Sequence, residues 1–217
     1  MKKRKMMALS VKQTMQVGDM FSKNKKYINY YYIIIFLILS WKLESNTDIR
    51  IEILEHINSL ENFSASFIQN DSESLSEGKV YIGMQRVRAE YFYPSNILII
   101  LDEDKAMYYN YELEEDEFFN PKDTKAWFFY DIFRNQYFFE DSKITLKKNE
   151  VLIEKHGFDD DKSKYLVKVY FENSPLILRK IEVFINEEFL QISIFDHNYN
   201  ENFDKNFFKL INPKLLN

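Results

Sequence analysis

The chain contains no cysteine, and among its 217 residues it has only four glycines, four prolines and three histidines. Without cysteine it can form neither a disulfide nor a thioether-linked lipid anchor, so its stability must come from burial and strand pairing. The scarcity of glycine and proline leaves little sequence for a flexible linker. These absences favour one folded domain.

The sequence also lacks the motifs of common enzyme classes. It has no H-E-x-x-H, G-x-S-x-G or glycine-rich phosphate loop. Two of the three histidines directly follow a carboxylate, His56 after Glu55 and His197 after Asp196, but neither pair belongs to such a motif. The acidic runs 102–104 and 159–161 lack the alternate-residue ligand spacing of a calcium loop and are interpreted as exposed turns. We therefore expect no catalytic residue, no metal site and no cofactor.

Aromatic residues, in contrast, are abundant: the chain has 20 Phe, 15 Tyr and 2 Trp. An ordinary core of this size needs less aromatic surface, and the surplus suits an apolar cavity. AT-rich codon usage, which also favours Phe, Tyr, Ile, Asn and Lys, is the alternative explanation, and composition alone does not separate the two.

The N-terminal region has the parts of an export signal. Lys23, Lys25 and Lys26 precede an uncharged run at 30–39, which is shorter than the roughly 20 residues that a membrane-spanning helix needs. We expect residues 1–41 to be a signal peptide, with cleavage near 40–45 and Met20 as an alternative start. An uncleaved inner-membrane anchor is the alternative to cleavage.

The remaining domain, residues 42–217, holds 21 basic and 33 acidic residues, a net charge of −12. Nucleic acids and anionic membrane surfaces repel a protein of this charge. The acidic run 112–117 is interpreted as an exposed hairpin. We expect no nucleic-acid partner.

Periodicity predicts a mainly β protein with helices (α+β): a curved antiparallel sheet that forms an incomplete barrel and is covered by a helical lid. Ile51, Leu54, Ile57 and Leu60 recur at helical spacing, and a second helix is predicted after the cap Asn120, as far as Phe133. Strands are predicted at 64–70, 79–83, 86–93, 97–101, 106–110, 114–118, 143–148, 151–155, 165–171, 178–186, 190–196 and 207–211.

Four anchors at fixed spacing stand out between 81 and 110: Arg88-Ala89-Glu90-Tyr91, Pro94, Asp102 and Tyr109-Asn110. This order resembles the outer-membrane lipoprotein carrier family LolA, which has an R-W-x-Y-x-x-P segment, an Asp in the next turn and a Y-D pair after it. Further similarity extends the resemblance over roughly residues 48–213.

The resemblance implies a periplasmic carrier that moves lipoproteins from the inner to the outer membrane, as a monomer and without a cofactor. Its partners would be lipoproteins, through their acyl chains, an inner-membrane lipoprotein-releasing ABC transporter and, where one exists, an outer-membrane acceptor. A periplasmic lipid- or lipoprotein-sensing regulator of the same fold is the alternative. The residues expected to line the apolar cavity and its lid are Val87, Ala89, Tyr91, Tyr93, Trp127, Phe129, Tyr130 and Phe133.

One element of the family pattern is missing. In LolA an arginine inside the sheet is thought to latch the lid, and the corresponding positions here are Gly83 and Met84. Period-two alternation predicts that position 83 shares the inner face with Val87, and that Arg86 and Arg88 lie on the other face. Arg88 is interpreted as an exterior residue paired with Glu90 or a neighbour.

Overall fold

The computed structural model describes residues 45–71, 73–159 and 162–216. The chain divides between Asp48 and Ile49, and the unit Ile49–Asn217 holds the strands. The predicted signal peptide, residues 1–41, lies outside the described residues. Within the described ranges, no helix combines the length and the apolar character that crossing a membrane requires.

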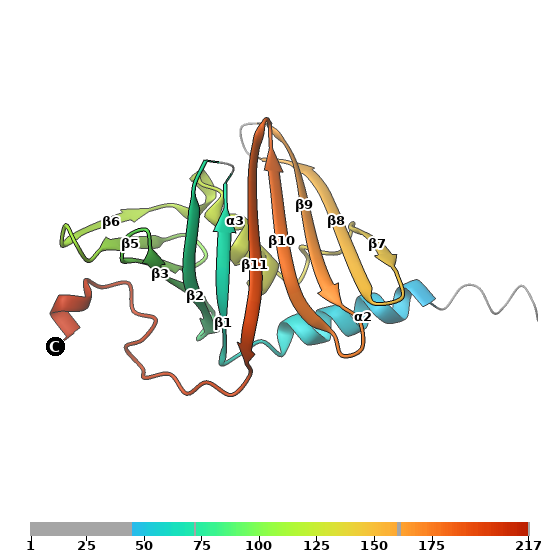
Figure 1. Ribbon diagram of the computed structural model, residues 1–217, viewed down its shortest axis with the longest axis horizontal. Coiled ribbons are helices and arrows are strands. Elements are labelled where there is room, and N and C mark those ends of the chain that lie inside the picture. The colour runs from blue at the N-terminus through green and yellow to red at the C-terminus, as the bar shows by residue number, and fades with distance from the viewer. Residues whose placement is uncertain (1–44, 72, 160–161, 217) are drawn as a thin grey trace, which may run out of the picture. The chain divides into compact units, whose positions relative to one another are not determined.

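The described residues form one 11-stranded antiparallel sheet with the order β6-β5-β4-β3-β2-β1-β11-β10-β9-β8-β7 (Figure 1). Its terminal strands, β6 and β7, do not pair with each other, so the sheet stays open. This confirms the predicted incomplete barrel with helices. The strands are β1 (Phe63–Asn70), β2 (Leu75–Gly83), β3 (Arg86–Tyr93), β4 (Ile97–Leu101), β5 (Ala106–Asn110), β6 (Glu115–Phe119), β7 (Lys143–Leu146), β8 (Glu150–Phe158), β9 (Lys164–Glu172), β10 (Ile177–Ile185) and β11 (Glu188–Asn198).

The inner face of the sheet and the helices share one large hydrophobic core. Inward residues alternate along each strand, as Val167, Val169 and Phe171 do on β9, and all three are buried. Figure 1 shows α3 behind the central strands in that view.

Helix α2 (Ser45–Asn58) buries Ile49, Ile53 and Ile57 in this core. These residues repeat every four positions and so lie on one helix face. Ile51 was predicted to belong to the buried face, but its side chain is 50% exposed. It lies two residues after the buried Ile49, which places it on the opposite side of the helix, away from the sheet. The observed stripe is therefore 49, 53 and 57.

The second predicted helix is split in two. Asn120 accepts a hydrogen bond from the Lys122 amide (3.1 Å) and caps the short 3₁₀ helix η1 (Pro121–Asp123), and α3 (Ala126–Arg134) follows. Phe128, Ile132 and Phe133 are buried. α3 thus packs as a cover on the inner face.

The outer face of β4 and β5 carries a second, smaller core. Leu98, Ile100, Met107 and Tyr109 are buried there, and Leu210 packs against them. β4 is therefore covered on both faces, which explains its uninterrupted apolar sequence.

The C-terminal segment (residues 199–216) provides this outer cover (Figure 1). The predicted strand at 207–211 is wrong: these residues are irregular and pair with no strand. Instead, the carbonyls of Phe207 and Phe208 accept hydrogen bonds from the guanidinium groups of Arg88 and Arg86. The arginine side chains of β3 thus provide these carbonyls with the hydrogen bonds that a neighbouring strand would otherwise provide. A short 3₁₀ helix, η2 (Pro213–Leu216), follows.

The two open edges of the sheet differ in sequence. β6 begins with Glu115, Asp116 and Glu117, all exposed, and belongs to the predicted acidic hairpin. β7 has four residues and begins with the exposed Lys143. Charge and short length therefore mark the unpaired edges.

Two histidines give the domain a predicted pH dependence. His56 on α2 packs edge-on against Phe171 (ring centroids 6.0 Å apart), and burial lowers its pKa, with a further contribution from His197. Burial also lowers the pKa of His197. Because the folded state favours the neutral rings, their contribution to stability is complete above the unfolded pKa of about 6.5 and is lost progressively as the pH falls below it.

We expect the melting temperature to decrease from pH 7 to pH 5, and His56→Gln to reduce this decrease. His156→Gln, at an exposed position of β8, is the matched control. Thermal unfolding followed by circular dichroism at both pH values measures the difference. Equal pH dependence in His56→Gln and the unsubstituted protein would contradict the assignment.

Candidate functional site

An apolar cavity of about 270 Å³ lies between α3 and the inner face of the sheet. Ala126, Phe129 and Phe133 form its helical wall, and the opposite wall comes from β1–β4, β10 and β11. Of the residues predicted to line a cavity, five do so: Val87, Ala89, Tyr91, Phe129 and Phe133.

Phe67 forms part of the wall because residue 78 has no side chain. A Cβ at Gly78 would lie 2.5 Å from Cζ of Phe67, too close for any other residue without a shift. The Phe67 ring meets Tyr91 edge-on, with centroids 5.1 Å apart. Glycine here therefore shapes the cavity.

Polar side chains gather at one end of the cavity. Gln69, Asp71 and Lys125 line it, and the Tyr91 hydroxyl donates a hydrogen bond to Gln69 Oε1 (2.9 Å). Burial raises the pKa of Tyr91 to about 12, so this hydroxyl stays protonated at neutral pH. The cavity thus has apolar walls and a polar rim.

Three predicted lining residues lie elsewhere. Tyr93 is 55% exposed, because it lies beyond the last β3–β4 pair, Tyr91 with Ile97. Trp127 and Tyr130 line a separate hollow on the other side of α3, because they point away from Phe129 and Phe133 around the helix. The sequence shows aromatic groups on all sides of α3 and does not distinguish these directions.

The late strands β10 and β11 also line the cavity, which was not predicted from the sequence. Leu190, Ile192 and Ile194 of β11 and Ile181 of β10 line the cavity, although they are distant in sequence from β3 and α3. The sequence shows that these residues alternate along predicted strands. It does not show that β1 pairs with β11, and this pairing places them beside the early strands.

Ion pairs hold both ends of α3. Lys125, immediately before the helix, pairs with Glu188 of β11. Arg134, the last residue of the helix, donates from Nη1 to Glu61 Oε2 (2.7 Å), and Glu61 Oε1 accepts from the Met84 amide (2.6 Å). The Arg134 side chain is only 7% exposed. α3 therefore carries its own arginine anchor, which reaches toward the β2–β3 turn.

The sequence prediction for position 83 is wrong. Gly83 pairs with Arg86 across the two-residue turn, so both lie on the outer face, and Ile82 pairs with Val87 on the inner face. Counting odd and even positions through the turn gave the wrong face, because odd-numbered residues of β2 pair with even-numbered residues of β3. A Cβ at Gly83 would lie 3.0 Å from ring atoms of Phe203 and Phe208. An arginine at 83 would point into the outer cover and not toward α3.

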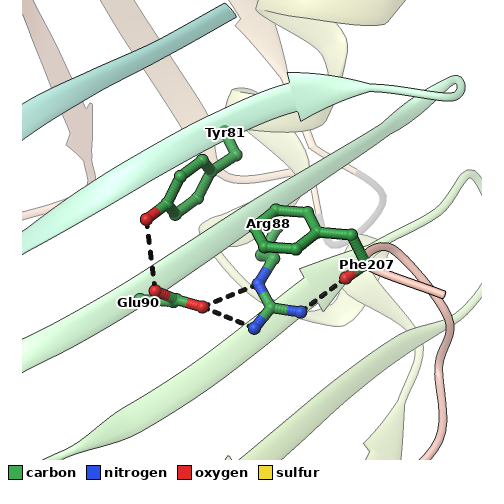
Figure 2. Close-up of polar contacts among 4 residues, drawn as sticks. All are labelled: Tyr81, Arg88, Glu90 and Phe207. Atoms are coloured by element: carbon green, nitrogen blue, oxygen red, sulfur yellow. Dashed lines mark hydrogen bonds and ion pairs between the residues drawn. The ribbon is translucent and has the colours of Figure 1, made fainter. Parts of the chain in front are cut away.

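Arg88 lies on the outer face, as expected. Figure 2 shows its guanidinium between Glu90 and Phe207: Nε donates to Glu90 Oε1 (2.9 Å), and Nη1 donates to the Phe207 carbonyl. The guanidinium also lies over the Phe207 ring, 4.2 Å from its centroid. Tyr81 donates to Glu90 Oε2 (3.3 Å), and burial, with the charge of Glu90, raises the pKa of Tyr81 to about 12.

Four further residues that carry the resemblance also lie away from the cavity. Pro94 occupies the β3–β4 turn, Asp102 pairs with Arg86 (2.7 Å), and Tyr109 is fully buried in the outer core. Asn110 Oδ1 accepts from the amides of Glu112 (2.9 Å) and Leu113. Among the anchors between residues 88 and 110, Ala89 and Tyr91 line the cavity, and the others lie in turns or on the outer face. Within the described residues, no group of three or more His, Asp or Glu side chains is arranged to hold a metal.

The chain matches no protein-family model and no curated protein sequence. Among solved structures, an uncharacterized conserved protein from Thermus thermophilus is similar over 78% of this chain and 96% of its own length, with a TM-score of 0.51 and 9% identity. This similarity concerns the fold.

Two more distant similarities were found. MucB, in the MucA/MucB complex of Pseudomonas aeruginosa, aligns over 76% of this chain and 61% of that one, with a TM-score of 0.44 and 8% identity. LprF from Mycobacterium bovis aligns over 69% of this chain and 93% of its own length, with a TM-score of 0.37 and 8% identity. The contacts within this chain itself show an open antiparallel sheet with an apolar cavity beneath α3.

Proposed function

We propose that this protein is an exported carrier that holds the acyl chains of lipoproteins in the cavity beneath α3 and moves them through the periplasm to the outer membrane. The observation that supports this most directly is the cavity itself: apolar walls, a polar rim and a covering helix. Burying each methylene group contributes about 0.8 kcal/mol, so a lipid chain gains strongly from such a site.

The size of the cavity limits what it can hold with α3 in place. Its volume of about 270 Å³ is below the range of roughly 300–1,000 Å³ that is usual for ligand pockets. We therefore expect the closed cavity to accept one short chain. A cargo with several acyl chains requires α3 to move outward.

The anchors of α3 are suited to such a movement. Lys125 with Glu188, and Arg134 with Glu61, hold the helix through side chains at its two ends. The partners in this proposal are an inner-membrane ABC transporter as donor and an outer-membrane acceptor. Release requires that cargo binding be partly offset by the cost of opening.

The test is to isolate the protein from the periplasmic fraction and to analyse bound material by mass spectrometry. We expect acylated polypeptide or lipid in stoichiometric amount. In a second assay, purified protein added to spheroplasts should release newly made lipoproteins into the soluble fraction. Protein free of acyl groups that also releases no lipoprotein would contradict the proposal.

A further inference from the structure

The solvent side of α3 borders a second and larger hollow, of about 790 Å³. α3 contributes Trp127, Tyr130, Asp131 and Arg134 to it. The remaining walls come from the end of α2, the β2–β3 and β4–β5 turns, η1, the loop after α3 and the end of β8. We call it the outer hollow. No residue of it lines the apolar cavity.

The outer hollow has an excess of negative charge. Its two cations already have carboxylate partners outside the lining: Lys122 Nζ lies 2.8 Å from Asp104 Oδ1, and Arg134 is bound to Glu61. The lining carboxylates Glu103, Asp131 and Asp159 have no ion-pair partner among the described residues. With Asp104 and Glu61 included, five carboxylates face two cations, an excess of three negative charges.

Asp131 is the most restricted of these carboxylates. It is half-buried on α3, and burial raises its pKa, although a hydrogen bond with Asn135 and the charge of Lys122 act in the opposite direction. A carboxylate that has lost part of its hydration gains from a nearby cation. Trp127 and Tyr130 beside it offer aromatic faces, which also attract ammonium and guanidinium groups.

The lining also carries groups that form hydrogen bonds. Its amide side chains, such as Gln85 and Asn135, can both donate and accept. A ligand that presents backbone amide and carbonyl groups together with positive charge is therefore complementary to this hollow.

A peptide with lysine or arginine residues has both properties. Its backbone can form hydrogen bonds with amide side chains such as Gln85, and its basic side chains can pair with Asp131 and Glu103. An inorganic anion lacks the cation, and a neutral glycan leaves the carboxylates unpaired. The hollow and the cavity are separated by the thickness of one helix, about 10–12 Å, which three or four extended residues can span.

We propose that the outer hollow binds a basic, unfolded peptide segment, and that this segment belongs to the same acylated polypeptide whose lipid chain occupies the apolar cavity. The second clause rests on the proposed function. The first does not, because a peptide without a lipid chain would still bind here. α3 would then lie between the two parts of one cargo molecule.

The test uses fluorescein-labelled, non-acylated ten-residue peptides and full-length protein, with dissociation constants measured by fluorescence anisotropy. A peptide of alternating serine and lysine should bind at least tenfold more tightly than its serine and glutamate counterpart. Asp131→Asn with Glu103→Gln should weaken the lysine peptide at least tenfold. Glu103→Gln alone, at an exposed turn position, should weaken it in the same direction without affecting folding.

The matched control is Glu112→Gln with Glu117→Gln, which makes the same charge change on the β5–β6 hairpin and should leave the dissociation constant unchanged. Equal weakening by both pairs would reduce the effect to net charge and overturn the site. Equal binding of the two peptides, or binding of a neutral oligosaccharide in their place, would overturn it as well.

The two proposals fail separately. The non-acylated peptide reports on the hollow alone, and a fluorescent fatty acid reports on the cavity alone. Fatty-acid binding without peptide binding leaves the carrier and removes this inference. Peptide binding without fatty-acid binding leaves a peptide site and removes the carrier.

Discussion

Replacing Phe129 with aspartate is expected to abolish the binding of acyl chains. Phe129 projects from α3 into the apolar cavity, where its neighbours across the space include Ile99 and Ile192. A carboxylate there faces apolar walls without a partner, at a cost of several kcal/mol in either the closed or the loaded state. Titration with a fluorescent fatty acid should show no saturable binding.

The control for this experiment is Phe92→Asp. Phe92 is 55% exposed on the same strand as the cavity residues Ala89 and Tyr91, but outside the cavity, so the same chemical change should leave binding intact. Phe129→Leu should also retain binding, which separates loss of shape from burial of charge. Undiminished binding by Phe129→Asp, with an unchanged circular dichroism spectrum, would show that lipid binds elsewhere.

The second large effect concerns stability. Phe208 is 1% exposed and packs edge-on against Phe203 and Phe207, with its ring also beside Gly83. Phe208→Ala should lower the free energy of unfolding by about 3–5 kcal/mol. At about 2–4 °C per kcal/mol for a domain of this size, the melting temperature should fall by roughly 6–20 °C.

Phe118→Ala is the matched comparison, because Phe118 is 44% exposed on β6 and its loss should change stability by less than about 0.5 kcal/mol. Hydrogen exchange should also become faster in the C-terminal segment of Phe208→Ala. If both substitutions proved equally mild, the outer cover would contribute little to folding, and the burial of Leu98 and Tyr109 would need another explanation.

The sequence predicted local structure well where residues that end a strand coincide with the limits of an alternating pattern. β3, β4 and β5 begin and end at the predicted residues, because Pro94 and the acidic turn after Leu101 interrupt strands of clear character. The segment at 207–211 looked like a strand by composition, but a strand also needs a neighbour. The carbonyls of Phe207 and Phe208 instead accept hydrogen bonds from Arg88 and Arg86 of β3, which are about 120 positions away in the sequence.

The site was only partly predictable for a related reason. Val87, Ala89 and Tyr91 share a face by alternation within one strand, which sequence shows directly. The face of Gly83 depends on the geometry of the turn at Met84 and Gln85. Phe129 faces the cavity and Tyr130 faces the other hollow, and this difference depends on what packs on each side of α3. Both features are determined by tertiary contacts, which the sequence does not show directly.

The acidic start of β6 has a consequence for the behaviour of the protein at high concentration. An open sheet offers unpaired backbone groups along both margins, and these are templates for adding strands from another copy. Antiparallel addition at β6 would bring the carboxylates of Glu115, Asp116 and Glu117 from two molecules face to face. Mutual repulsion therefore disfavours the addition of a second copy at β6, and concentrated salt, which screens exposed charges, would weaken that repulsion.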